Sequence, residues 1–180
     1  MKDVAPSAAT TTRACSSNSL LLSRMRMLKQ SFLWVCEVTR QLGRILGATL
    51  QQPVTIALTG GLGSGKTVFV QGLAQGLDVS DQNYITSPSF TIMNEYPGRH
   101  PLYHVDLYRI EHLSELEDIG LEEALQADAV IAIEWAEKLS QDMLLDHLQL
   151  RFDIIDENSR RIDIFAYGQP TANLLKALEF

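Results

Sequence analysis

Residues 60–67 read Gly-Gly-Leu-Gly-Ser-Gly-Lys-Thr, and this stretch decides the fold. It matches the phosphate-binding loop pattern, which is a glycine, any four residues, then Gly-Lys and Ser or Thr. An apolar run at 54–58 (Val-Thr-Ile-Ala-Leu) precedes the loop and predicts a buried strand. Apolar residues at helical spacing follow the loop over 67–77. A position between a strand and a helix distinguishes a true phosphate-binding loop from a chance match.

The residue types of the loop suit the recognition of nucleotide phosphates. Glycines let the backbone approach the phosphate oxygens and point successive N–H groups at them, and the following helix presents its positive end. Lys66 can reach the terminal phosphates, and a hydroxyl at the place of Thr67 is a magnesium ligand in such loops. We therefore predict a site for ATP or GTP with Mg²⁺, built from Gly61, Leu62, Gly63, Ser64, Gly65, Lys66 and Thr67. A glycine-rich turn beside an ordinary lysine is the alternative.

Two acids in predicted strands are candidates for the magnesium side of this site. Glu134 closes the apolar run Val-Ile-Ala-Ile-Glu at 130–134, and Asp106 lies in His-Val-Asp-Leu-Tyr at 104–108. A buried carboxylate is costly without a partner, so we expect a cation beside either acid. The alternatives are a solvated strand end or a salt bridge, for example between Asp106 and Arg109.

Three further features lie beside these motifs. His104 could be a ligand or a base, but we favour a hydrogen-bonded structural histidine. Trp135 directly follows the acid, and it either belongs to the core or lies at the site, where it would shield the nucleotide or meet a partner. The polar segment 86–90, Thr-Ser-Pro-Ser-Phe, lies where proteins with phosphate-binding loops often keep a phosphate-sensing switch. A plain surface loop is the alternative for this segment.

The rest of the pattern predicts an α/β fold with a mixed sheet. Two antiparallel hairpins are predicted, from strands at 90–96 and 102–108 and from alternating apolar residues over 148–154 and 162–166. Helices are predicted from 35 to Gly47, from near 115 to Gly120 behind a capping box of Ser114 and Glu117, and from a cap at Thr171 to Leu178. The predicted fold is a single P-loop NTPase-like domain, in which helices flank a sheet that contains antiparallel hairpins.

Length and composition suit one globular domain. The chain has 180 residues, of which 46% are hydrophobic. The net charge of -7 and the pI near 5.0 argue against nucleic-acid binding by bulk charge alone. Cys15 and Cys36 are too few for a disulfide framework or a zinc site, so a reducing cytoplasm is expected. No stretch approaches the roughly 20 apolar residues of a membrane helix.

The first 30 residues differ from the rest in charge and pattern. They carry a net charge of +4, are rich in Ser and Thr, and show no sustained periodicity before Leu20. We predict a disordered extension over 1–30 and a P-loop ATPase domain over 31–180. A transit peptide has a similar composition, and translation from Met25 or Met27 would remove most of the stretch, so these alternatives stay open.

Four blocks of sequence, in this order, are similar to the motifs of the TsaE (YjeE) family, the bacterial P-loop ATPases of threonylcarbamoyladenosine tRNA modification. The blocks are Gly-Gly-Leu-Gly-Ser-Gly-Lys-Thr at 60–67, Thr-Ser-Pro-Ser-Phe at 86–90, Tyr-His-Val-Asp-Leu-Tyr-Arg at 103–109 and Ile-Glu-Trp-Ala-Glu at 133–137. The resemblance covers residues 31–168. The chain departs from the family pattern at Gly61, where an acid is usual.

This resemblance implies a single-domain α/β fold that binds ATP with Mg²⁺ and acts on two related proteins, TsaB and TsaD. TsaD transfers the threonylcarbamoyl group to an adenosine beside the tRNA anticodon, and ATP turnover by the TsaE component resets that machine between cycles. The chain would then meet tRNA only through the TsaB–TsaD complex. By motif position, Lys66 is the phosphate lysine, Thr67 and Glu134 lie on the magnesium side, and Asp106 is an ATPase residue. Arg160, after the turn of the second hairpin, would flank the base or the phosphates.

Two other classes of function also fit a phosphate-binding loop. A small-molecule kinase needs a lid with arginines and an acceptor pocket, but the segment from the loop to Glu134 is mostly hairpin and contains only Arg99 and Arg109. A nucleotide-gated binding module without useful turnover is the stronger alternative, because the sequence shows no evident arginine finger. The partner surface and the oligomeric state stay open.

Overall fold

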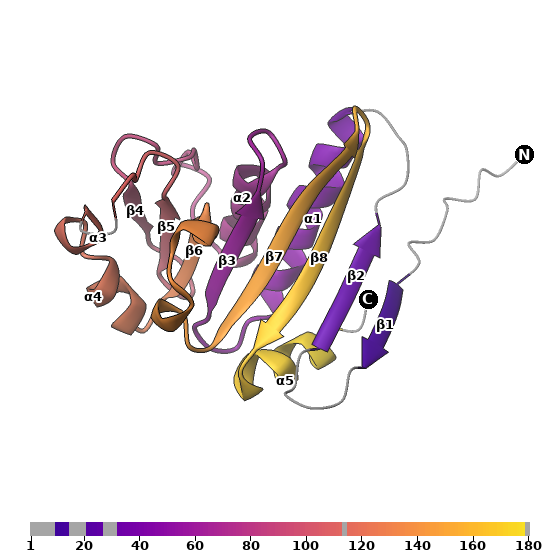
Figure 1. Cartoon of the computed structure of the whole chain (residues 1–180). Helices are drawn as coiled ribbons and strands as arrows, with labels where there is room; N and C mark the ends of the chain where they lie inside the picture. The colour runs from indigo at the N-terminus through magenta and orange to yellow at the C-terminus, as the bar shows by residue number, and fades with distance from the viewer. Residues whose placement is uncertain (1–9, 15–20, 27–31, 113–114, 179–180) are drawn as a thin grey trace, which may run out of the picture.

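The computed structural model describes residues 10–14, 21–26, 32–112 and 115–178. Within them, one eight-stranded sheet runs in the order β1-β2-β8-β7-β3-β6-β5-β4 (Figure 1). Its strands are β1 (Thr10–Ala14), β2 (Leu21–Arg26), β3 (Thr55–Gly60), β4 (Met93–Tyr96), β5 (Leu102–Asp106), β6 (Val130–Glu134), β7 (His147–Asp156) and β8 (Ser159–Tyr167).

The centre of the sheet is parallel and its flanks are antiparallel. β3 pairs in parallel with β6 on one side and with β7 on the other, and β5 pairs in parallel with β6. The hairpins β4–β5 and β7–β8 add antiparallel strands on either side of this centre. The predicted α/β fold, its mixed sheet and both of its hairpins are therefore confirmed.

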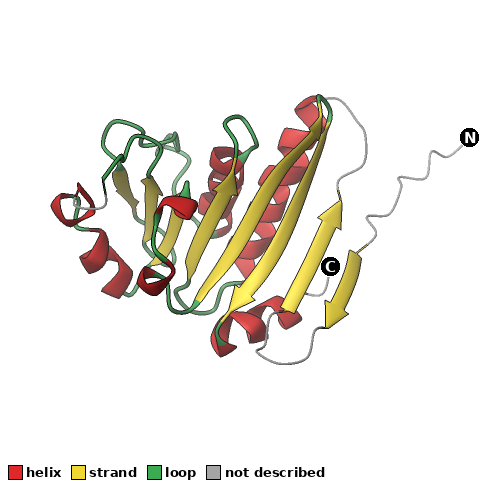
Figure 2. Cartoon of the chain, in the orientation of Figure 1, coloured by secondary structure: helices red, strands yellow, loops and turns green. Residues whose placement is uncertain are grey.

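Helices cover the centre of the sheet with two apolar layers (Figure 2). They are α1 (Phe32–Thr49), α2 (Lys66–Gly76), α3 (Glu115–Asp118), α4 (Leu121–Gln126) and α5 (Gln169–Ala177), with the single 3-10 turns η1 (Ala136–Lys138) and η2 (Gln141–Met143). Ile56 and Leu58 of β3 pack in the layer that contains α1 and α2, while Ala57 between them packs with α3, α4 and η1. This alternation follows from the two-residue period of a strand.

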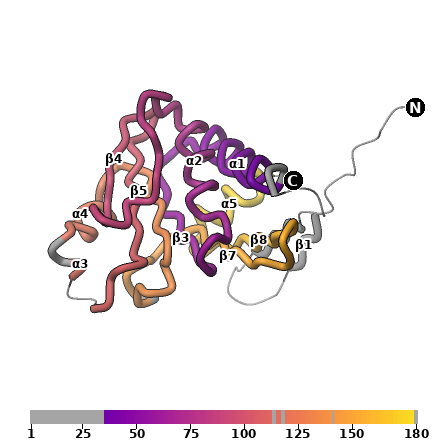
Figure 3. Tube along the Cα trace, turned by 90° about the horizontal axis from the view of Figure 1, so that it is seen from above, coloured from indigo at the N-terminus to yellow at the C-terminus, as the bar shows by residue number. Residues whose placement is uncertain are grey.

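Helices α1 and α2 lie side by side on one face of the sheet, in backbone contact (Figure 3). A Cβ atom on Gly72 would collide with the carbonyl oxygen of Arg40, and a Cβ atom on Gly43 would collide with the backbone of α2. The same contact explains why α1 continues to Thr49 instead of ending at the predicted Gly47, which packs against the α2 backbone. The close approach fixes α1 beside the helix that follows the phosphate-binding loop.

Two strands occupy part of the segment that was expected to be a disordered extension. β1 pairs with β2, and β2 pairs with the edge of β8, from Leu21 opposite Ala166 to Arg26 opposite Arg161. An unpaired edge strand offers a row of free backbone groups, and pairing of this kind needs no apolar periodicity. Residues 1–9, 15–20 and 27–31 lie outside the described residues, so the division of the chain at residue 30 stays a prediction.

The two predicted helix caps have different outcomes. Ser114 lies outside the described residues. The cap at Thr171 is wrong, because α5 begins at Gln169 with Gly168 as its N-cap. The Thr171 hydroxyl instead donates to the carbonyl oxygens of Tyr167 at 2.6 Å and Gly168 at 3.0 Å, inside the first turn.

Candidate functional site

Three polar side chains from β5 and β6 face α2. Val105 and Ile133 belong to the apolar layer beneath α3 and α4, so their neighbours His104, Asp106 and Glu134 point to the opposite face of the sheet. Asp106 is the register partner of Glu134. Because β3, β5 and β6 are parallel, these strand ends meet the loop that follows β3. The fold thus brings both predicted acids beside the phosphate-binding loop.

The phosphate-binding loop wraps around the ammonium group of Lys66. Gly60, Gly63 and Gly65 have φ angles of +132°, +71° and +110°, which other residues rarely adopt. This path lets Lys66 Nζ donate hydrogen bonds to the carbonyl oxygens of Gly60 at 2.7 Å and Gly61 at 3.0 Å. The backbone of the loop therefore satisfies the cation at the centre of the predicted site.

Lys66 lies in an environment that is partly buried and rich in negative charge. Burial lowers the pKa of Lys66 from its ordinary value, while the negative charges of Glu134, Glu137 and Asp106 oppose this shift. Lys66 Nζ also lies 4.0 Å from the centre of the Trp135 ring, within the range of a cation–π contact. Trp135 directly follows Glu134, and its backbone adopts the left-handed conformation, with a φ of +60°. Trp135 belongs to both the core and the site, because it packs against the apolar layer beneath α3 and α4 and its ring lies beside Lys66.

Glu134 is tied to both the loop helix and the neighbouring strand. Thr67 Oγ1 donates a hydrogen bond to Glu134 Oε1 at 2.8 Å, and His104 Nε2 lies 2.9 Å from the same oxygen. The exposed fraction is 3% for Glu134 and 0% for His104. The histidine is thus hydrogen-bonded, as predicted, and its partner is one of the two predicted site acids.

Asp106 is held by the segment 86–90. Its Oδ2 accepts hydrogen bonds from the hydroxyls of Ser87 and Ser89, the latter at 3.2 Å. The salt bridge considered between Asp106 and Arg109 does not form. The guanidinium group of Arg109 instead lies over the ring of Phe90, with its central carbon 4.5 Å from the ring centre. The polar segment is therefore part of the site and touches one of its acids.

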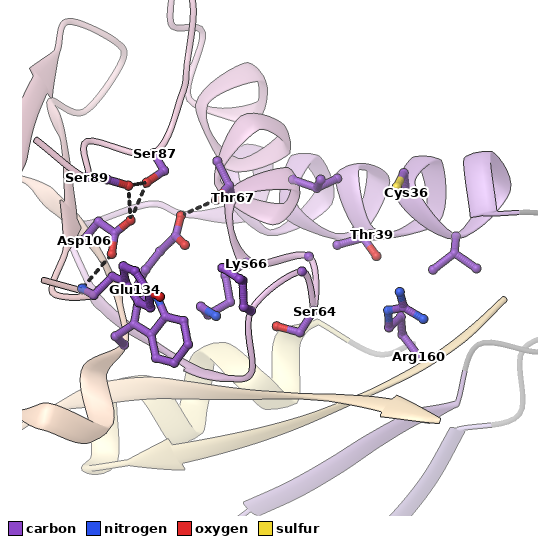
Figure 4. A pocket seen from close by; sticks show the side chains of 17 residues that line it. Cys36, Thr39, Ser64, Lys66, Thr67, Ser87, Ser89, Asp106, Glu134 and Arg160 are labelled. Carbon is purple, nitrogen blue, oxygen red and sulfur yellow. Dashed lines mark hydrogen bonds between the residues drawn. The ribbon is translucent and has the colours of Figure 1, made fainter. Parts of the chain in front are cut away.

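These groups line one pocket of about 450 Å³ (Figure 4). Every residue predicted for the site lines this pocket except Gly61, which immediately precedes the lining residues of the loop. Helix α1 adds a wall that the sequence motifs did not indicate, formed by Val35, Cys36 and Thr39. No local signal marks these three residues, because their place depends on how α1 packs against α2.

Arg160 lies at the end of the pocket away from the acids, near Cys36 and Thr39 (Figure 4). It is 7% exposed, and one of its guanidinium nitrogens donates to the carbonyl oxygens of Asp156 at 2.8 Å and Ser159 at 3.1 Å. These bonds fix the guanidinium against the pocket wall. The pocket thus has a cation at each of two places, Lys66 in the loop and Arg160 at the far end.

The pocket fits a phosphate ligand with a magnesium ion. Thr67 and Glu134 offer the hard oxygen atoms that Mg²⁺ prefers. The Ser64 hydroxyl lines the pocket and is buried, with no hydrogen-bond partner in the part of the chain that the structure describes. Among the described residues, no group of three or more His, Cys, Asp and Glu side chains could hold a metal by itself. A magnesium ion here would therefore need phosphate oxygens and water as further ligands.

Comparison with known proteins identifies the family. A family model described as threonylcarbamoyl adenosine biosynthesis protein TsaE matches residues 35–162. The chain belongs to the TsaE family. The matched range contains both strand-end acids, the whole phosphate-binding loop and Arg160. TsaE membership makes this chain a P-loop nucleotide-binding protein and confirms the resemblance read from the four motifs.

Individual TsaE proteins support the same conclusion. The chain is 35% identical over 126 residues to the tRNA threonylcarbamoyladenosine biosynthesis protein TsaE of Treponema pallidum, covering 70% of this chain and 92% of that protein. It is 39% identical over 149 residues to the TsaE of a Nostoc species, covering 80% of this chain and 90% of that protein. The similarity therefore extends over nearly the whole length of these TsaE proteins.

A solved structure agrees with the fold. The crystal structure of YdiB from Bacillus subtilis matches with a TM-score of 0.72 at 29% sequence identity, covering 90% of this chain and 97% of YdiB. The described part of the present chain contains no helix that is both long and apolar enough to cross a bilayer.

Proposed function

We propose that this chain is the ATP-hydrolysing component of tRNA threonylcarbamoyladenosine biosynthesis. The observation that carries the proposal is the meeting of Lys66, Thr67, Asp106 and Glu134 in one pocket, where β3, β5 and β6 end. A phosphate cradle, a metal-binding pair and a second acid are the parts that phosphoryl transfer to water requires. The names of the TsaE relatives support the assignment to this pathway.

In this proposal the phosphates of ATP lie in the loop at 61–67, against its backbone N–H groups and the N-terminus of α2. Lys66 exchanges its carbonyl partners for the terminal phosphates. Because the Thr67 hydroxyl donates a hydrogen bond to Glu134, the Thr67 oxygen keeps its lone pairs for a metal, and Glu134 completes the magnesium side. A bound magnesium ion would neutralise part of the negative charge on the phosphates.

Asp106 is the proposed acid for the attacking water. It lines the same pocket as Lys66 and Glu134, and the hydroxyls of Ser87 and Ser89 orient its carboxylate. A catalytic group must be held in place to act on a water molecule, and these bonds meet that need. The segment 86–90 would thereby couple the position of Asp106 to nucleotide binding.

The far end of the pocket is proposed to receive the adenosine part of ATP. Val35, Cys36 and Thr39 give this end a largely apolar wall, and Arg160 can stack on or flank the base. In this arrangement the length of the pocket separates the base from the terminal phosphate.

We further propose that the chain acts on a TsaB–TsaD complex in the cytoplasm. The net charge of -7 makes broad electrostatic contact with tRNA unfavourable, so TsaB–TsaD would supply the tRNA-binding surface. The site also points to dependence on a partner. Among the described residues that line the pocket, the basic ones are Lys66 and Arg160, and Arg160 lies at the far end. Fast phosphoryl transfer usually needs an arginine at the terminal phosphate.

The same observation favours a second candidate function, a nucleotide-gated binding module without useful turnover. In that case ATP binding would fix the segment 86–90 for docking, and hydrolysis would be incidental. The two functions differ in whether repeated cycles of tRNA modification need a cleavable nucleotide.

The experiment that tests the proposal combines capture and modification. Tagged chain is mixed with TsaB–TsaD, tRNA and a preformed activated threonylcarbamoyl donor, in the presence of ATP, a non-hydrolysable ATP analogue or no nucleotide. The threonylcarbamoyladenosine formed per TsaD is then measured on the tRNA. We expect that capture of TsaB–TsaD depends on nucleotide. We also expect repeated modification cycles with ATP but not with the analogue or without nucleotide. Equal cycling with the analogue would establish the binding module. An absence of capture together with no effect on modification would refute both functions.

A further inference from the structure

His104 is completely buried beside the site, and nothing in the proposed function so far uses it. It lies on β5, two residues before Asp106, with an exposed fraction of 0%. Its Nε2 is 2.9 Å from Glu134 Oε1. The residues that line the pocket include Glu134 but not His104, so His104 faces the pocket from behind the carboxylate.

The direction of this hydrogen bond follows from the chemistry of its acceptor. Glu134 Oε1 already accepts a hydrogen bond from the Thr67 hydroxyl, and an ionised carboxylate can only accept. Nε2 of His104 is therefore the donor. The other ring nitrogen, Nδ1, is buried and has no hydrogen-bond partner within the described part of the chain.

An unpartnered buried nitrogen disfavours folding, and an apolar side chain would fill the same space without it. Among the described residues, the one polar contact of the His104 ring is the contact with Glu134. The ring thus orients the Glu134 carboxylate but lowers the stability of the folded state. A residue with a purely space-filling role would not show this combination.

We propose that His104 is a positioning residue that holds the Glu134 carboxylate in place for magnesium; the inference rests on the proposed function. Thr67 and His104 both bind Oε1, which leaves Oε2 of Glu134 available to the metal or its waters. When the Thr67 oxygen also binds the metal, His104 is the second donor that keeps Glu134 from rotating away. Hydrogen bonds to a metal-binding carboxylate typically change metal affinity by about 10- to 100-fold.

The test uses two amide variants that differ only in reach. The amide nitrogen of His104→Gln can take the place of Nε2, whereas the shorter side chain of His104→Asn places its amide nearer Nδ1. Calorimetry measures ATP affinity over a series of Mg²⁺ concentrations and without Mg²⁺, for the whole chain. We expect His104→Gln to keep the parent Mg²⁺ requirement and His104→Asn to raise it about tenfold. His147→Asn, which changes another imidazole, is the control and should leave the requirement unchanged.

The readouts separate positioning from structure. A structural role would lower the melting temperature and the metal-free ATP affinity of His104→Asn together, without moving the Mg²⁺ requirement. A Mg²⁺ requirement equal to the parent's in both His104 variants would overturn the inference and leave the proposed function standing. If the ATP affinity of the parent chain does not depend on Mg²⁺, the magnesium site of the proposed function is wrong. The inference about His104 is then wrong as well.

Discussion

Replacing Lys66 with alanine is expected to weaken ATP binding at least tenfold. The Lys66 ammonium is the cation held inside the phosphate-binding loop, where it donates to the carbonyl oxygens of Gly60 and Gly61. A charge-assisted hydrogen bond contributes about 1.5–3 kcal/mol, and about 1.4 kcal/mol corresponds to a factor of ten. Isothermal titration calorimetry of the variant and the parent with ATP measures the change.

The control for this prediction removes a positive charge elsewhere. Lys176 is exposed near the end of α5, so Lys176→Ala should bind ATP like the parent. Unchanged ATP affinity in the Lys66 variant would contradict the assignment of the loop as the phosphate site.

Replacing Glu134 with glutamine or Asp106 with asparagine is expected to abolish most ATP hydrolysis while much of the ATP affinity remains. Each change keeps the shape of the side chain and removes its negative charge. Both acids are buried at the carboxyl ends of adjacent strands, where Thr67 binds one and the serines of 86–90 bind the other. Loss of one group that acts on the transition state typically costs about 10²–10³ in rate.

Phosphate release with TsaB–TsaD present measures the rate, and calorimetry measures the affinity of the same preparations. Glu137→Gln is a matched control, because Glu137 is exposed and acts on Lys66 through charge but does not line the pocket. Hydrolysis at the parent rate by both the Glu134 and the Asp106 variant would mean that these acids are structural.

The parts of the fold and site that could be predicted are those with a local pattern. Each of these patterns occupies one short window of sequence: the glycine loop between an apolar run and a helix, the hairpin of strands at 90–96 and 102–108, and an acid closing an apolar strand. Parallel pairing then brings the strand-end acids to the loop, because the carboxyl ends of parallel strands share one edge. This is why Lys66, Thr67, Asp106 and Glu134 could be named before the structure was known.

The parts that could not be predicted depend on contacts between distant segments. Gly47 reads as a helix end, but α1 needs it for close packing against α2. That packing in turn places Thr39 of α1 in the wall of the pocket. The hydrogen bond from Ser87 to Asp106 and the one between His104 and Glu134 likewise join separate stretches of chain. Edge pairing of β2 with β8 depends on backbone groups, which carry no side-chain signature.

Steady-state phosphate release is the most direct test of the central claim, that this chain hydrolyses ATP in service of TsaB–TsaD. The rate is measured for the chain alone, then with the heterodimer, then with tRNA added. We expect slow hydrolysis by the chain alone, because its site holds Lys66 but no arginine near the terminal phosphate among the residues lining the pocket. The heterodimer should raise the rate at least about tenfold, by fixing the segment 86–90 or by supplying the missing charge. A rate that is already high for the chain alone and indifferent to TsaB–TsaD would contradict the account.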